Sequence, residues 1–292
     1  MRYQAALRPV RRAEPELHVR PHGGKDGCPD ARRPSFAQPA AAACPFSDAV
    51  ASANLMAPQL AGIFVDPTRR TALLAGLFFI GTFVFSIPAL TLYGPLLNDA
   101  NYVVGAGADG AIHLGAFLEI LTAIANIGTA VVLFPVVRRA SEPVALGYVA
   151  SRTLESTIIV VGAISLLAVV TLRQDFAAAG GADPALHVAI AKALVALHDW
   201  TFLLGPAFCA GLGNGILLGY LMYRSQLVPR PWAVLGMAAG CIAFASATAV
   251  LFGVYDQVSP VSFLFTIPEI VWEAFLGLYL TFNGFRRSPA AG

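Results

Sequence analysis

LHDWTFLLGPAFCAGLGNGILLGYLMYRSQLVPR, residues 197–230, is the stretch around which the rest of the chain is organised. It begins with the polar pair His198 and Asp199, continues as an apolar run and ends in a basic turn that contains a proline. An apolar run of about 20 residues is long enough to cross a bilayer as a helix. We expect this stretch to be the fourth of six membrane spans, with a bend at Gly205 and Pro206 because proline removes a helical hydrogen bond.

The composition of the whole chain indicates a membrane protein. Hydrophobic residues make up 57% of the 292 residues and charged residues only 12%, about half of the roughly 25% typical of soluble domains. We therefore predict an all-α fold, a polytopic bundle of six transmembrane helices in contact with the lipid bilayer. The six apolar runs lie at 71–92, 111–137, 148–172, 200–223, 232–255 and 262–282.

The first part of the chain differs from the rest. It is rich in Ala, Pro, Arg and Gly and has no helical period, so we expect a disordered tail at 1–68, a membrane domain at 69–287 and a short tail at 288–292. No apolar segment of the kind found in a signal peptide follows its early arginines. We hypothesise that the natural start lies near Met56 and that residues 1–55 are an upstream extension, which N-terminal sequencing of the natural product would test.

The basic residues predict an orientation. With the N-terminus in the cytoplasm, nine arginines lie inside and only Arg173 and Lys192 lie outside, which is the positive-inside pattern. We predict a protein of the cytoplasmic membrane with both termini in the cytoplasm. The nine are Arg69, Arg70, Arg138, Arg139, Arg152, Arg224, Arg230, Arg286 and Arg287.

Glycines on the fourth and fifth spans form small faces. Gly211, Gly215 and Gly219 are four residues apart and share one side of a helix. The fifth span carries Gly236 and Gly240 at the same spacing. Because small residues let two helix backbones approach closely, we predict a contact between spans four and five, with homo-oligomerisation through the glycine face as the alternative.

Ionisable side chains inside the spans are the candidates for a functional site, because a charge within the membrane costs several kcal/mol. Glu269 and Glu273 lie one turn apart on the sixth span, and Glu119 lies at a similar depth in the second. If spans two, four and six are neighbours, these groups line one outward-facing polar cavity together with polar residues near the outer helix ends. The candidate residues are Glu119, His198, Asp199, Glu269, Glu273 and His113.

Three functions are compatible with this set. The glutamates can be protonated and hydrogen-bond between helices, which is a packing role. The cavity can bind, transport or sense a small solute or ion. The third candidate is a membrane-embedded hydrolase with a His/Asp/Glu metal site, although no HExxH and no Cys/His metal spacing is present. No motif indicates a cofactor, and the net charge of +2 is spread without a basic field for nucleic acid.

Two further polar groups lie within the predicted spans. Arg152 and Glu155 are three residues apart near the inner end of the third span. We expect a local ion pair, with Arg152 reaching back to the inner headgroups. Asn126 and Asn214 lie near the middle of their spans and are expected to hydrogen-bond between helices.

Four segments carry a family resemblance. They are LEILTAIANIGTAVVLFPVVRR (118–139), GYVASRTLESTIIVVGAISLL (147–167), the stretch at 197–230 and IPEIVWEAFLGLYLTFNGF (267–285). They resemble the uncharacterised bacterial multi-pass membrane family labelled domain of unknown function 4386, over about 69–285. The resemblance implies a bacterial cytoplasmic-membrane protein and implies no activity.

Overall fold

The structure is a computed structural model that describes residues 67–286. All regular structure in this part of the chain is helical, and it contains no strand. Six helical segments are long and apolar enough to cross a membrane. The prediction of an all-α bundle with six spans is thereby confirmed.

The predicted tails lie almost wholly outside these residues. Of the segment 1–68, only Pro67 and Thr68 are described, and both belong to the first helix rather than to a tail. The proposed start at Met56 and the C-terminal segment 288–292 also lie outside the described residues.

Each apolar run lies within one helical segment, except that α7 ends four residues before its run, and α4 extends six residues beyond its run at both ends. The helices are α2 (Pro67–Leu97), α3 (Asp109–Val137), α4 (Glu142–Ala178), α5 (Pro184–Phe202), α6 (Gly219–Ser225), α7 (Arg230–Leu251) and α8 (Pro260–Phe282). Three short segments join them, the 3-10 turn η1 (Tyr102–Val104) and the π-helical segments η2 (Leu203–Cys209) and η3 (Gly211–Leu218). Together α5, η2, η3 and α6 form one continuous span, Pro184–Ser225.

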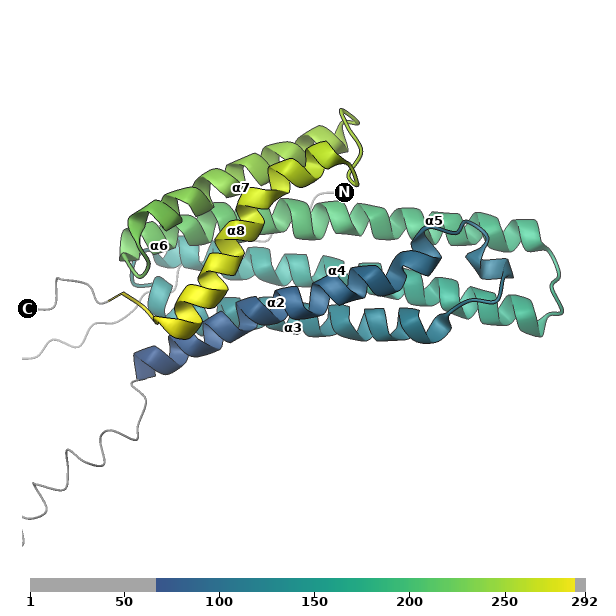
Figure 1. The fold of residues 1–292 in the computed structure, drawn as a ribbon, viewed down its shortest axis with the longest axis horizontal. Helices are drawn as coiled ribbons and strands as arrows, with labels where there is room; N and C mark the ends of the chain where they lie inside the picture. The colour runs from purple at the N-terminus through teal and green to yellow at the C-terminus, as the bar shows by residue number, and fades with distance from the viewer. Residues whose placement is uncertain (1–66, 287–292) are drawn as a thin grey trace, which may run out of the picture. The chain divides into compact units, whose positions relative to one another are not determined.

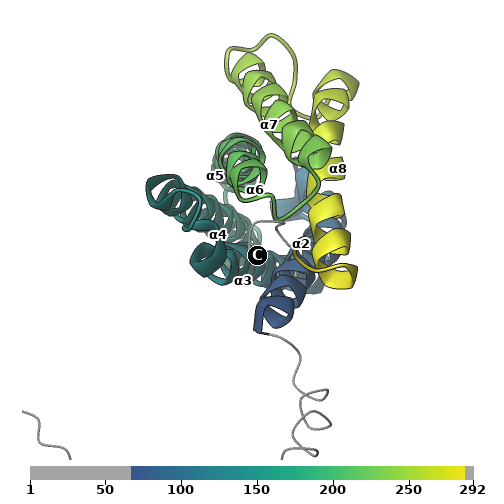
Figure 2. The same ribbon diagram turned by 90° about the vertical axis from the view of Figure 1, so that its left-hand side faces the viewer.

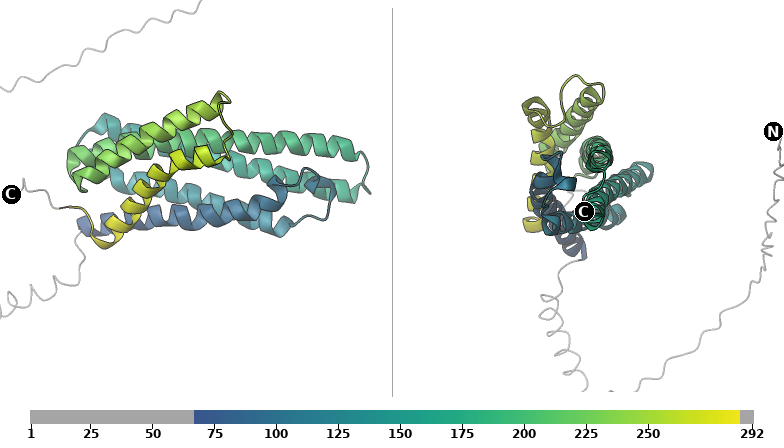
Figure 3. Two further views of the ribbon diagram at one scale, coloured as in Figure 1. Left: turned by 45° about the horizontal axis from the view of Figure 1, so that its top comes forward. Right: turned by 90° about the vertical axis from the view of Figure 1, so that its right-hand side faces the viewer.

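The helices α2 to α5 pack in chain order, each beside the next, while α7 and α8 form a separate hairpin (Figures 1 and 2). Helix α8 crosses α2 obliquely near the start of α2 and pairs with α7 (Figure 3). The crossing is close, because a Cβ atom added at Gly76 would lie 2.6 Å from the backbone nitrogen of Thr281. Helix α8 therefore reaches the interior of the α2–α5 group from one side.

A backbone contact joins η3 to α7. A Cβ atom added at Gly215 would lie 2.2 Å from the Cα of Gly240, and one at Gly211 would lie 3.1 Å from the carbonyl oxygen of the same residue. A Cβ at Gly219 would lie 2.9 Å from the backbone nitrogen of Met237. The three glycines of the fourth span thus face the fifth span, in a tight contact at Gly211 and at distances that leave no room for a side chain at Gly215 and Gly219.

Gly236 has a different neighbour. A Cβ atom there would lie 2.5 Å from the ring of Trp272, which is fully buried on α8. The indole Nε1 donates a hydrogen bond to the backbone oxygen of Asn214 at 2.9 Å. Trp272 therefore fixes α8 against both α7 and η3, and with it the position of the next residue, Glu273.

Gly205 and Pro206, where the sequence predicts a bend, lie in the π-helical segment η2. Proline cannot donate the hydrogen bond of a regular helical turn, and π-helical turns are wider than α-helical ones. A backbone carbonyl group of this π-helical segment accepts a hydrogen bond from another helix. The Ser151 hydroxyl on α4 donates to the backbone oxygen of Cys209 at 2.9 Å.

Arg69→Ala is expected to lower the free energy of unfolding by about 1–2 kcal/mol. The Arg69 guanidinium donates to the final carbonyl groups of α8, at 3.0 Å to Leu280, 2.7 Å to Thr281 and 3.0 Å to Phe282. Arg70→Ala is the matched control, because Arg70 is the exposed neighbour in sequence. Unfolding in mixed detergent micelles measures both variants, and an equal loss in both would contradict this role for Arg69.

Candidate functional site

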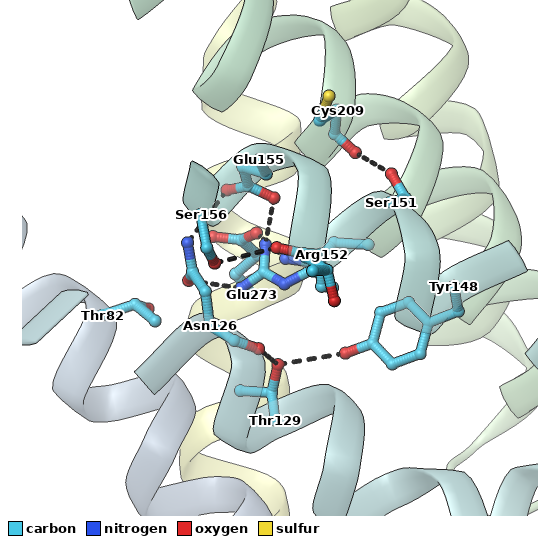
Figure 4. Close-up of polar contacts among 12 residues, drawn as sticks. Thr82, Asn126, Thr129, Tyr148, Ser151, Arg152, Glu155, Ser156, Cys209 and Glu273 are labelled. Atoms are coloured by element: carbon cyan, nitrogen blue, oxygen red, sulfur yellow. Dashed lines mark hydrogen bonds and ion pairs between the residues drawn. The ribbon is translucent and has the colours of Figure 1, made fainter. Parts of the chain in front are cut away.

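The centre of the candidate site is Arg152, whose side chain is only 2% exposed. It lies about 15 Å along α4 from the first residue of that helix. Its Nη1 donates to Glu155 Oε2 at 2.8 Å, and its Nη2 donates to Asn126 Oδ1 at 2.5 Å (Figure 4). Asn126 Nδ2 in turn donates to Glu155 Oε1 at 3.2 Å. The three side chains therefore close a ring between α3 and α4.

The expectation that Arg152 reaches the headgroups is wrong, although its local ion pair with Glu155 is present. Helix α4 begins at Glu142, six residues before the predicted start of the third span, so Arg152 lies about 9 Å deeper than expected. At that depth the guanidinium is held by partners inside the protein. The available signal in the sequence was Asn126, an amide near the middle of the neighbouring span.

Two further contacts hold α3 and α4 together beside this ring. The Ser156 hydroxyl donates to the backbone oxygen of Ala123 at 3.1 Å. The Tyr148 hydroxyl donates to Thr129 Oγ1 at 3.2 Å (Figure 4). All four residues belong to the facing sides of the two helices, so the geometry around Arg152 is fixed on both sides.

A second carboxylate approaches Arg152 from α8. Asn214 Nδ2 on η3 donates a short hydrogen bond to Glu273 Oε1. Figure 4 shows Glu273 beside Arg152, and the two charges interact electrostatically. The buried guanidinium is therefore paired with Glu155 on its own helix, and the Glu273 carboxyl group of another helix adds to the electrostatic field around it.

A cavity of about 240 Å³ adjoins this network, and we call it the chamber. Its mouth is flanked by Ile87 and Leu90 of α2, which are 62% and 51% exposed, and by Phe202 of α5, which is 37% exposed. These residues lie at least seven residues from either end of their spans, so the chamber opens sideways between α2 and α5. Its ionisable and amide lining consists of Glu119, Asn126, Arg152, Glu155, His198 and Glu273.

Three of the six candidate residues from the sequence lie in the chamber wall: Glu119, His198 and Glu273. Tyr93 on α2 joins the first two. Its hydroxyl donates to Glu119 Oε2 at 2.9 Å, and its ring meets the ring of His198 edge-on with 5.7 Å between centroids. His198 is 4% exposed, so its ring forms an inner part of the wall.

The other three candidates lie elsewhere. Glu269 is buried between α8 and η3, where its Oε2 would be 2.9 Å from a Cβ atom at Gly215. Asp199 is exposed and lines a separate depression that also contains Lys192. His113 is exposed on α3, with its Nδ1 2.8 Å from the backbone oxygen of its own preceding turn. The structure therefore places three of the six predicted residues in the chamber wall and three elsewhere. The centre of the wall is formed by Arg152 and Glu155 of α4.

A polar network at the end of the bundle away from Arg69 has a structural role. The Tyr102 hydroxyl in η1 donates to Asp109 Oδ1 at 3.0 Å, and Arg173 Nε donates to the same oxygen at 2.7 Å. Burial raises the pKa of Tyr102 to about 12, and the hydrogen bond to the Asp109 carboxylate adds to this. These groups hold the loop between α2 and α3 against α4.

The chemistry that the chamber offers is that of carboxylates, an amide, an imidazole and one guanidinium. Within residues 67–286, no three His, Cys, Asp or Glu side chains come together in a way that could hold a metal ion. The wall is therefore suited to binding charged or hydrogen-bonding groups.

Comparison with known proteins identifies a family. The model of the family described as "Domain of unknown function (DUF4386)" matches residues 74–284, which is more than two thirds of the chain. No curated protein and no solved structure matches the chain.

Proposed function

The chain belongs to the DUF4386 family, whose description assigns no function, and we propose from the chamber itself that this integral membrane protein binds a small amphiphilic cation. Binding there is the recognition step of either transport or sensing. The observation that carries the proposal is a chamber with a charged inner wall and an apolar mouth that opens on the side of the bundle, away from the ends of the spans.

The charges in the chamber wall favour a cationic ligand. Three carboxyl groups line the chamber, those of Glu119, Glu155 and Glu273, and Arg152 supplies the one guanidinium. That guanidinium is already held by Glu155 and Asn126. Because opposite charges attract strongly where water is excluded, an added cation is stabilised by the carboxyl groups in excess.

The mouth of the chamber favours a ligand with an apolar body. The exposed side chains of Ile87, Leu90 and Phe202 lie at the depth of lipid tails in a bundle of this length. An alkyl or aryl group packs against these residues while its charged end meets the carboxyl groups. The ligand class is thus an amine with a short hydrocarbon chain.

We also propose that the Arg69 end of the bundle lies in the cytoplasm. Arg152 is buried, so it does not count among the basic residues at the cytoplasmic surface. Eight arginines then lie on the cytoplasmic side and two basic residues on the outer side, which still follows the positive-inside pattern. With this orientation Glu119 lies about 28 Å from Arg138 at the cytoplasmic end of α3, so the chamber extends into the outer half of the membrane.

Hexylammonium is the probe that tests this function, with hexanol and hexanoate as ligands of the same length and different charge. We expect hexylammonium to raise the melting temperature of the purified protein in detergent and hexanoate to leave it unchanged. Glu119→Gln should weaken hexylammonium binding by about tenfold, or 1.4 kcal/mol, because it removes one carboxylate from the wall.

Asp199→Asn is the matched control, since Asp199 is an acidic residue outside the chamber. It should leave binding unchanged. Equal responses to all three probes, or no response to hexylammonium in the wild type, would contradict the proposal and leave the carboxyl groups with a packing role.

A further inference from the structure

Two buried polar groups on different helices have no hydrogen-bond partner. Glu269 on α8 is 5% exposed, and neither of its carboxyl oxygens has a partner. Asn214 on η3 is fully buried, and its Oδ1 also has none. Such groups are destabilising unless something satisfies them, and a buried carboxylate without a counter-charge is the more costly of the two.

The two groups flank the same glycine. Glu269 Oε2 occupies space beside Gly215 that a side chain would fill, 2.9 Å from the position of a Cβ atom there. Asn214 immediately precedes Gly215. The carboxyl group therefore lies beside the close approach of η3 to α7, where Gly215 meets Gly240.

A proton on Glu269 would make its carboxyl group a donor, and a donor is what the Asn214 amide oxygen lacks. An ionised carboxylate only accepts hydrogen bonds, whereas a protonated carboxyl group also donates one, and the amide oxygen needs a donor. We propose that Glu269 is a proton-binding site, that its proton is shared with Asn214, and that Asn214 links this site to Glu273 in the chamber wall.

The link to the chamber rests on the amide of Asn214. Its Nδ2 donates to Glu273 Oε1, so its oxygen and nitrogen can serve two carboxyl groups at the same time. When Glu269 loses its proton, both carboxylates compete for the same N–H donors. The hydrogen bond that fixes Glu273 beside Arg152 is then weakened.

The other charged groups that act on Glu269 are few. Glu273 lies one turn away on the same helix, and Arg152 and Glu155 act from α4. On η3 the neighbour of the Glu269 carboxyl group is Gly215, which follows Asn214 in sequence, and α7 presents the backbone of Gly240 to the same glycine. The protonation of Glu269 is therefore coupled to the charges that form the wall of the chamber.

This coupling, which rests on the proposed function, makes the proton and the cation competitors. A cation in the chamber and a proton on Glu269 each add one positive charge to the same network of residues. Since the two disfavour each other, entry of the cation releases the Glu269 proton to solvent and leaves a carboxylate. The regulation of the chamber is thus an exchange of one proton for one cation.

Infrared spectroscopy tests the proton site without any ligand. The wild type should show the carbonyl stretch of a protonated carboxylic acid at neutral pH, and Glu269→Gln should lack that band. Glu119→Gln, a change at another carboxyl group within the spans, should retain it. Asn214→Leu should shift the band, because the amide oxygen that accepts from the protonated carboxyl group is lost. If this variant fails to fold, the comparison of Glu269→Gln with Glu119→Gln alone decides whether Glu269 carries the proton.

The proton site is overturned if no band at neutral pH depends on Glu269. It is also overturned if sodium chloride, compared with choline chloride, stabilises the wild type but not Glu269→Gln, since a metal cation then occupies the site.

Calorimetric titration with hexylammonium tests the exchange between about pH 6 and pH 8, where an alkyl amine stays protonated. In the wild type the Kd should fall with rising pH, by up to about tenfold per pH unit, with release of a proton. In Glu269→Gln the Kd should depend on pH clearly less than in the wild type, because only the carboxyl groups that line the chamber remain to titrate. The same pH dependence in both proteins overturns the exchange, whereas binding in neither overturns the proposed ligand and leaves the proton site to the infrared result.

Discussion

Arg152→Met is expected to lower the free energy of unfolding by about 3–5 kcal/mol. The substitution keeps most of the volume of the side chain but removes the guanidinium that holds Glu155 and Asn126. Glu155 is 4% exposed, so its carboxylate would be left in the bundle with only the amide of Asn126. A buried charge that loses its partner is far more destabilising than a pair that is absent from the start.

The double variant Arg152→Met with Glu155→Leu separates this effect from simple loss of packing. It removes both charges, so we expect it to recover most of the stability that the single variant loses. Arg152→Lys should recover only part, because an ammonium group cannot make the two-pronged contact with Glu155 and Asn126. Unfolding by titration with a denaturing detergent measures all three, and equal losses in the single and double variants would refute the role of the ion pair.

Gly215→Ala is the second large effect, an expected loss of about 3 kcal/mol, near the upper end of what overpacking causes. The new Cβ atom would lie 2.2 Å from the Cα of Gly240, and backbone cannot move aside as a flexible side chain can. It would also lie 2.9 Å from Glu269 Oε2. The fourth and fifth spans must therefore separate.

Gly110→Ala is the control for this substitution. Gly110 lies in the first turn of α3, where a Cβ atom meets nothing within 4 Å. Alanine favours a helix by up to about 1 kcal/mol relative to glycine, so this variant should be as stable as the wild type or slightly more stable. A loss in Gly110→Ala as large as that in Gly215→Ala would show that the helix contact is not the cause.

The spans could be predicted from sequence because the signal is local. Each requires only a run of about 20 apolar residues, and the membrane imposes that length whatever the neighbours are. Depth was harder to predict, because α4 begins with a polar turn at Glu142 that hydropathy assigns to a loop. Those six extra residues place Arg152 in the interior rather than at the headgroups.

The membership of the site depends on which way each helix is rotated. His198 and Asp199 are adjacent on one helix, and adjacent residues point in different directions, so spacing alone could have excluded one of them from the chamber. Glu269 and Glu273 could not be separated in this way, because they share a helical face. Trp272 and its hydrogen bond to Asn214 fix the rotation of α8. Only this packing shows that, of the two glutamates on α8, Glu273 lines the chamber and Glu269 does not.

In the proposed function, the sideways mouth of the chamber means that the ligand arrives from the lipid, and the occupancy of the chamber follows the ligand's concentration among the acyl chains. Each additional CH₂ group favours partition into the bilayer by about 0.8 kcal/mol, or about fourfold. A homologous series of alkyl amines therefore gains apparent affinity before any contact with Ile87 or Phe202. For the proposed ligand class, the bilayer itself is then the first selectivity filter, and it selects by chain length.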